Sequence, residues 1–386
     1  LGLPGALAAY DAAAAVAAHE QAHELRAKRA LAQVKMSDPQ GALQYLKDVH
    51  PTTVAGRLAE ALAYSGAAAL GHGDPAEGTR RAAESRRLAL ASGDTGSLVI
   101  ASWAQAAAAH ARGELHSSVW ADLHETAQFP HLAVRVFDGH LCITQRFLYG
   151  SRPYPQVIAF ADGLATEARR LGAERGYAFA VTLRGEAQLL NGQLDAAEQD
   201  LMEGGRLHRA IGGATGEALA LQRRAELAMY RGRRGEAGGL LDEALDLARQ
   251  SDVGFHLLDR IYGTRIAVAA DEQAALGELE EAAEAVRGPF ETCPGCRITF
   301  AVPATIAAAR AHELTLASQH EQSADYLANV VMKLPAWHAA LREARAHMAL
   351  ASGRREAALS GFAAAAAGFA AAGHPLDQAR CSALAR

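Results

Sequence analysis

The residues best placed to do chemistry are the two cysteines of the segment Cys293-Pro-Gly-Cys296. A Cys-x-x-Cys pair can present two thiolates to zinc, but a structural zinc site needs four ligands. The other two cysteines, Cys142 and Cys381, are remote in sequence. A redox dithiol normally lies beside a βαβ unit, which this region lacks. We therefore expect no metal at Cys293 and Cys296, and we interpret the segment as a tight Pro-Gly turn.

The remaining reactive residue types form no recognisable catalytic pattern. The sixteen histidines are scattered along the chain, and we expect most of them to be surface or helix-seam residues. The sequence contains neither a Gly-x-Ser-x-Gly elbow nor a phosphate loop ending in Lys-Ser/Thr. Abundant glutamate on helices is ordinarily a solvated face. We therefore predict no catalytic residues, no cofactor site and no resident metal, and the chain is not expected to be an enzyme.

The elements that position these side chains are helical hairpins, most clearly in two successive segments whose turn glycines are Gly192 and Gly232. Small residues recur at fixed offsets from each glycine, where two helix backbones must approach closely. Seven before, five after and twelve after the turn, these pairs are Gly185 and Ala225, Ala197 and Ala237, and Gly204 and Ala244. Nine residues after each turn, Leu201 and Leu241 supply a larger side chain that fills the seam.

The same pattern, with a period near forty residues, extends over the chain. It predicts hairpin turns at five glycines, namely Gly73, Gly113, Gly192, Gly232 and Gly353. We predict one all-α, right-handed superhelical solenoid of about nine hairpins over residues 1–386. Residues 287–303, which combine loop residues with a short β-like run, are expected to be a loop excursion between hairpins.

Composition supports a chain of many thin helix seams. Of the 386 residues, 50% are hydrophobic but only 6% are aromatic, and β-branched residues do not alternate as they would in strands. The net charge of −5, with acidic and basic residues interleaved, disfavours direct binding to nucleic acid. Because no apolar stretch is long enough to span a membrane and no signal peptide is evident, we expect a cytoplasmic protein with reduced cysteines.

The offsets of the small residues resemble those of the tetratricopeptide repeat (TPR), although the period is near forty and the early tryptophan of that family is missing. Long alanine-rich hairpins are similar to the MalT-like repeats of large ATP-binding LuxR-type transcription regulators. In those proteins the solenoid lies between an ATPase module and a helix-turn-helix, neither of which is present in this sequence. The resemblance implies that this chain is the sensor or scaffold portion of such a regulator.

In a solenoid of this kind the first helix of each hairpin lines the concave surface. The inward-facing positions of the two clearest hairpins are Thr182, Glu186, Leu189, Gln222, Glu226 and Met229. We predict that they contact solvent and form a site for a ligand or partner. The alternative is that Glu186 and Glu226 only pair with arginines of neighbouring hairpins, such as Arg223 or Arg184.

The function we expect is therefore ligand sensing or protein interaction within a bacterial transcription regulator, without catalysis. The partner would be a protein, a peptide or a small-molecule effector, with no nucleic acid or membrane contacted by this chain. The alternative is a free-standing TPR adaptor that holds partner proteins together. Because the chain begins at Leu1 without an initiator methionine, we expect it to be part of a longer polypeptide.

Overall fold

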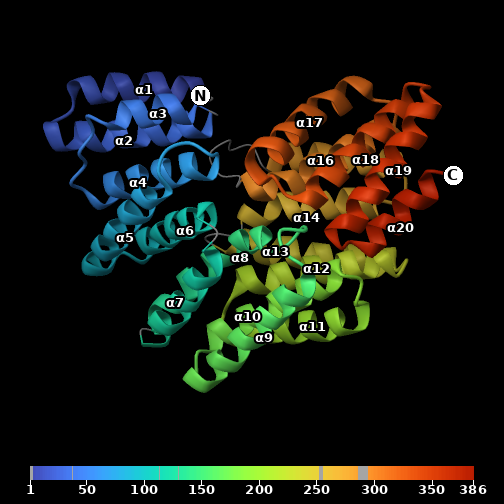
Figure 1. The fold of residues 1–386 in the computed structure, drawn as a ribbon, viewed down its shortest axis with the longest axis horizontal. Coiled ribbons are helices and arrows are strands. Elements are labelled where there is room, and N and C mark those ends of the chain that lie inside the picture. The colour runs from blue at the N-terminus through green and yellow to red at the C-terminus, as the bar shows by residue number, and fades with distance from the viewer. Residues whose placement is uncertain (1–2, 37, 113, 129, 252–254, 286–293) are drawn as a thin grey trace. The chain divides into compact units, whose positions relative to one another are not determined.

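The computed structural model describes residues 3–36, 38–112, 114–128, 130–251, 255–285 and 294–386. Over these residues every regular element is a helix, and most consecutive helices pack against each other (Figure 1). The predicted all-α solenoid is confirmed. Within the described helices, none has both the length and the apolar composition needed to cross a membrane.

The helices group into two compact units, residues 1–143 and 144–386, where the sequence led us to expect one array. The first unit contains eight helices among its described residues. They are α1 (Leu3–Val16), α2 (His19–Lys35), α3 (Pro39–Leu46), α4 (Val54–Ala69), α5 (Pro75–Ser92), α6 (Thr95–Ala111), α7 (Leu115–Gln128) and α8 (Pro130–Ile143).

A buried ionic cluster centred on Arg86 of α5 ties the first unit together. Its Nη1 donates to Asp122 Oδ1 at 2.7 Å, and its Nη2 donates to Glu125 Oε2 at 2.7 Å. His140 of α8 lies 2.6 Å from the other oxygen of Asp122. Burial alone would raise the pKa of Asp122, but His140 and Arg86 outweigh it and hold that pKa below its usual range. Helices α5, α7 and α8 are therefore joined through one carboxylate.

The second unit contains the remaining elements. They are the 3₁₀ turn η1 (Thr144–Arg146), α9 (Tyr154–Leu171), α10 (Glu174–Leu190), α11 (Leu194–Ala210), α12 (Ala214–Tyr230), α13 (Arg234–Gln250), α14 (Phe255–Val268), α15 (Glu272–Ala285), α16 (Pro294–Arg310), α17 (Leu314–Tyr326), the π-helical η2 (Leu327–Met332), α18 (Pro335–Ala351), α19 (Arg355–Ala372) and α20 (Pro375–Leu384).

The predicted hairpin turns are confirmed wherever the structure describes them. Gly73, Gly192, Gly232 and Gly353 lie between helices with φ values of +73° to +79°, the left-handed region that glycine tolerates best. Gly113 lies outside the described residues.

The predicted seams are also confirmed, because the small residues at the fixed offsets are buried. Ala197, Ala225, Ala237 and Ala244 all have 0% exposure. At Gly185 an added Cβ would lie 2.9 Å from Leu201 Cγ, so this position cannot accept a larger side chain without a shift. The spacing of small residues in the sequence therefore predicts correctly where two helices of a hairpin touch.

The expected loop excursion at 287–303 is wrong for its second half. Pro294 to Arg310 form the helix α16, and residues 286–293 lie outside the described part of the chain. The β-like residues lie in this helix because its buried face, including Ile298 and Phe300, packs into the unit. Pro294 is the first residue of the helix, a position where its missing N–H is not needed, so the Pro-Gly turn interpretation is also wrong.

Contacts between its beginning and its end close the second unit on itself. The N–H of Ala336, at the start of α18, donates to the carbonyl of Tyr149 at 3.1 Å. The Tyr154 hydroxyl lies 2.7 Å from His374 Nε2. An added Cβ at Gly192 would lie 2.8 Å from Pro375 Cγ, so α20 packs tightly on the turn between α10 and α11. The concave side of this unit is therefore enclosed by its own first turn and last helix.

We expect Ala225→Leu to lower the free energy of unfolding by about 1–3 kcal/mol, because the extra methylenes must fit where two helices touch. Ala364→Leu, at an exposed position in the middle of α19, is the matched control and should change stability by less than about 0.5 kcal/mol. Chemical denaturation followed by circular dichroism measures both. Equal stability of the two variants would show that Ala225 is not a seam position.

Candidate ligand-binding pocket

The second unit holds a cavity of about 870 Å³ on its concave side. Most of its lining comes from α12, α14, α16, α18 and α20, which are the first helices of successive hairpins. Small-molecule sites usually have volumes of roughly 300–1,000 Å³. The volume of the cavity therefore falls in the range of small-molecule sites, and we interpret the cavity as a ligand site and not as a packing defect.

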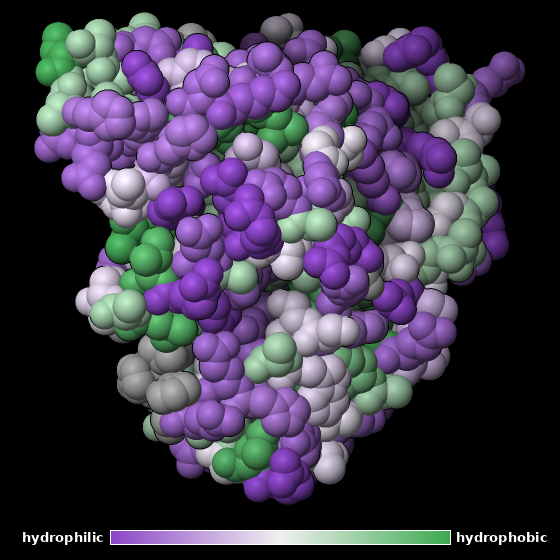
Figure 2. Space-filling model, turned by 60° about the vertical axis from the view of Figure 1, so that its left-hand side comes forward, coloured by the Kyte–Doolittle hydropathy of each residue, from purple (hydrophilic) through white to green (hydrophobic). Residues whose placement is uncertain are grey.

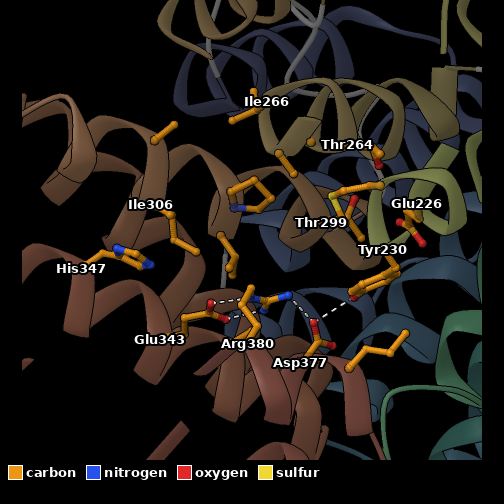
Figure 3. Close-up of a pocket in the computed structure, with 18 of the residues that line it drawn as sticks. Glu226, Tyr230, Thr264, Ile266, Thr299, Ile306, Glu343, His347, Asp377 and Arg380 are labelled. Atoms are coloured by element: carbon orange, nitrogen blue, oxygen red, sulfur yellow. Dashed lines mark hydrogen bonds and ion pairs between the residues drawn. The ribbon is translucent and has the colours of Figure 1, made fainter. Parts of the chain in front are cut away.

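One wall of the cavity is apolar and comes from α14 and α16. Ile266, Val302 and Ile306 line it, and Figure 3 shows Ile266 and Ile306 on this side of the cavity. The two helices approach closely at Gly263, where an added Cβ would lie 2.0 Å from the carbonyl oxygen of Thr299. Gly263 thus determines how near α16 lies to α14 and so where this wall stands.

The opposite wall is polar and depends on Arg380 of α20. Its Nε and Nη2 donate to the two carboxylate oxygens of Glu343 at 2.8 and 2.7 Å, and its Nη1 donates to Asp377 Oδ1 at 2.5 Å. Figure 3 shows the guanidinium between these two carboxylates. The Tyr230 hydroxyl also donates to Asp377, at 2.9 Å. Burial alone would raise the pKa of Asp377, but Arg380, His374 and Tyr230 hold it well below its usual range.

A second ionic cluster, centred on the fully buried Arg223, lies beside the cavity. Its Nε donates to Glu186 Oε1 and its Nη1 to Glu226 Oε2, both at 2.7 Å, while its Nη2 donates to the Tyr149 hydroxyl at 3.0 Å. Arg260 Nη2 donates to the same oxygen of Glu186 at 2.9 Å. The proposed pairing of Glu186 and Glu226 with Arg223 is therefore confirmed, whereas Arg184 does not take part.

The structure separates the six predicted wall residues into two groups. Thr182, Glu186, Leu189 and Gln222 are buried, so the prediction that they contact solvent is wrong. Glu226 and Met229 do line the cavity, and their binding of a ligand stays a prediction.

The reason for this correction is that each first helix is covered on several sides. Leu189 packs in a cluster with Ala197, Leu201 and Leu227, which come from α11 and α12. An added Cβ at Gly204 would lie 2.5 Å from the hydroxyl of Thr182, so this side chain points into the hairpin seam. Of the six predicted residues, Glu226 and Met229 are the two that line the cavity.

Several pocket residues were not foreseen from the sequence, namely Tyr230, Glu343, Asp377 and Arg380. They come from hairpins far apart in the chain, and the Tyr230–Asp377 hydrogen bond alone spans 147 residues. The useful signal was the segment YGSRPYP, residues 149–155, in which two tyrosines crowd one turn. Both belong to the network that closes the unit.

The structure describes one of the two cysteines of the Cys293-Pro-Gly-Cys296 segment. Cys293 lies outside the described residues. Cys296 is buried on α16, and its Sγ accepts a hydrogen bond from Gln145 Nε2 at 3.1 Å. This contact joins α16 to the first turn of the unit and gives Cys296 a structural role.

The expectation of no catalytic pattern among the histidines is wrong for one segment of the first unit. Residues 19–23 read His-Glu-Gln-Ala-His, a match to the pattern whose two histidines bind zinc and whose glutamate acts as a base. The rings of His19 and His23 lie 4.7 Å apart, and the ring of His50 lies 6.1 Å from that of His23. Over the described part of the chain, however, no three His, Cys, Asp or Glu side chains are placed to hold one metal ion. As placed, the motif lacks the convergent ligands of a zinc site.

No protein-family model matches this chain, and a search of curated proteins found no significant match.

We expect Glu186→Ala to lower the free energy of unfolding by about 3–5 kcal/mol, because it leaves two buried guanidinium groups without their shared carboxylate. Glu226→Ala should cost about 1 kcal/mol, since Glu226 is partly exposed and Arg223 keeps Glu186. Glu203→Ala, which removes an exposed pair with Arg206, is the control and should have little effect. Urea denaturation tests all three. Equal losses for Glu186 and Glu226 would contradict this account of the cluster.

We expect the thiol of Cys381 on α20 to react slowly, because it is fully buried and burial raises its pKa to about 12. Arg380→Gln removes the ionic contacts that hold this ten-residue helix, so labelling of Cys381 should accelerate about tenfold or more, equivalent to about 1.4 kcal/mol. Alkylation followed by peptide mass spectrometry measures the rate at this one cysteine. The control is Arg206→Gln, and similar rates in both variants would show that Arg380 does not hold α20.

Proposed function

We propose that this chain is a non-catalytic binding solenoid whose second unit takes a small-molecule effector or a short peptide into the concave cavity. The observation that carries the proposal is the cavity itself, a space of about 870 Å³ with one apolar and one polar wall. Pockets of this kind, mostly apolar with a few placed polar groups, are the usual form of a ligand site. Glu226 and Met229 would contact the ligand from α12.

The proposal includes a route from binding to a response. The cavity is bordered by α20 and by the contacts that join the last helices to the turn at Tyr149. A ligand that binds one arrangement of these elements better than another shifts the population toward it. We propose that this shift is passed to attached domains of a cytoplasmic bacterial transcription regulator, the setting that the likeness to MalT-like repeats suggests.

One face of the molecule shows no broad apolar docking surface among its described residues (Figure 2). On the face drawn in Figure 2, hydrophilic residues predominate and hydrophobic residues lie in separate groups. Two of the exposed large hydrophobic residues, Leu350 and Leu384, line the cavity instead. A bound ligand would cover them.

A thermal-shift screen of the whole chain against a fragment library and a peptide library tests the proposal. A ligand at one hundred times its Kd should stabilise the fold by about 2.7 kcal/mol. Met229→Trp, which places a larger side chain in the cavity lining, should reduce the shift, whereas Met202→Trp at an exposed position on α11 should keep it.

An empty screen, or hits that bind both variants equally well, would overturn the cavity as the binding site. The regulator setting is tested separately by sequencing the reading frame on both sides of this chain. Flanking ATPase and helix-turn-helix modules would support it, and a gene that encodes this chain alone would favour the adaptor alternative.

A further inference from the structure

The charges that line the cavity do not cancel. Four arginines and five carboxylates line it, and the five are Glu226, Asp271, Glu272, Glu343 and Asp377. Burial lowers the pKa of His347 to about 4, so this ring is uncharged at neutral pH. The cavity therefore carries an excess of one negative charge, provided that the other histidine in its lining, His374, is also neutral.

A neutral His374 ring fits all the hydrogen bonds made by its two nitrogens. The Tyr149 N–H donates to the Tyr154 hydroxyl oxygen at 3.0 Å, which leaves the hydroxyl proton for His374 Nε2 at 2.7 Å. His374 Nε2 is then an acceptor, and Nδ1 donates to Asp377 Oδ2 at 3.1 Å. This tautomer carries one ring proton and no net charge.

The excess negative charge comes from the two carboxylates that share the Arg380 guanidinium. One guanidinium there, whose side chain is 41% exposed, faces two carboxylates: Glu343, which is buried, and Asp377, whose side chain is 14% exposed. Two of the other three lining arginines have carboxylate partners: Arg223 pairs with Glu186 and Glu226, and Arg310 pairs with Glu272 at 2.7 Å. The third, Arg234, donates to the carbonyl oxygens of Ala269 and Ala270 at 3.5 and 3.4 Å. An anion would therefore enter a cavity with a net negative charge, whose guanidinium groups are largely engaged.

Next to this charge, α18 offers an acceptor for a cation. His347 lies one helical turn after Glu343, and Figure 3 shows the two side chains next to each other. A neutral imidazole has one ring nitrogen that accepts a hydrogen bond. The aromatic ring of Phe369 lines the same cavity and already has the Arg380 guanidinium 5.9 Å from its centroid. Such surroundings favour an ammonium group.

We infer that the cavity selects a small organic cation with an apolar body, such as an alkylammonium or arylalkylammonium compound. Its cationic head lies at Glu343 and His347, and its body lies against Ile266 and Ile306. This inference rests on the proposed binding function of the same cavity. It adds the chemical class of the ligand, which volume and apolar lining alone do not define.

Three probes with the same chain and different heads test the inference by isothermal titration calorimetry: octylammonium, octanoate and 1-octanol. All three can use the apolar wall, so the difference in Kd reports the head group. We expect octylammonium to bind at least about tenfold more tightly than octanoate, a difference of about 1.4 kcal/mol. Equal or tighter binding of octanoate would overturn the inference while leaving the cavity as a binding site.

A pair of glutamine variants locates the effect. Glu343→Gln removes the excess charge and keeps an acceptor for Arg380, so the preference for octylammonium should fall to about twofold or less. Glu203→Gln removes one negative charge from an exposed pair outside the cavity lining and should keep the full preference. Loss of the preference in both variants would show that net protein charge, not the cavity, is responsible.

Two outcomes, misfolding of Glu343→Gln and absence of binding by any probe, also bear on the inference. If Glu343→Gln does not fold, as judged by circular dichroism, Glu226→Gln provides the second removal of a cavity carboxylate and should reduce the preference as well. If none of the probes binds the unmodified chain, the inference of an amphipathic cation is wrong. The proposed function then fails only if the fragment and peptide screens are also empty.

Discussion

The second unit depends on one constraint, which is that the guanidinium group of Arg223 is fully buried and must keep its charge and its hydrogen bonds satisfied. An isolated buried charge is too costly to persist, so its partners have to arrive with it. They come from α10 through Glu186, from α12 through Glu226, and from the first turn of the unit through Tyr149. Three elements that share no hairpin are thereby held in one arrangement.

This arrangement continues to the end of the unit through polar contacts. The Tyr149 turn bonds to the start of α18, and Tyr154 bonds to His374, which bonds in turn to Asp377. Apolar seams stabilise each hairpin internally, but they are alike from hairpin to hairpin and do not specify which hairpins meet around the concave side. Hydrogen bonds and ion pairs between particular charged and polar side chains do specify which hairpins meet. We attribute the closure of the unit to them.

The cavity exists because the side chains that line the second unit are too short to fill the space between its helices. Alanine-rich helices meet closely at their seams, yet their small side chains do not extend into the space that the ring of helices surrounds. That space is lined by aliphatic residues on one side and by paired charges on the other. The groups that hold the unit closed, Arg380 above all, are therefore the same groups that would meet a ligand, so the proposed ligand binding would be coupled to closure.

Sequence spacing alone determined the helical hairpins, their glycine turns and their small-residue seams. These features depend on residues within about one hairpin of each other, and each follows from local physics: glycine tolerates a positive φ, and only small residues allow helix backbones to touch. At Gly185, Gly192 and Ala225 this was sufficient. Local spacing also identified Glu226 and Met229 as inward-facing.

Only the tertiary structure decided which inward-facing residues remain accessible and what they meet. Glu186 and Leu189 hold the same positions in their hairpin as Glu226 and Met229 hold in the next, but neighbouring helices bury Glu186 and Leu189. The contacts between Tyr149 and Arg223 and between Tyr154 and His374 span 74 and 220 residues. Such pairs depend on the rotation accumulated over many hairpins, to which every seam contributes, and no local spacing in the chain encodes that sum.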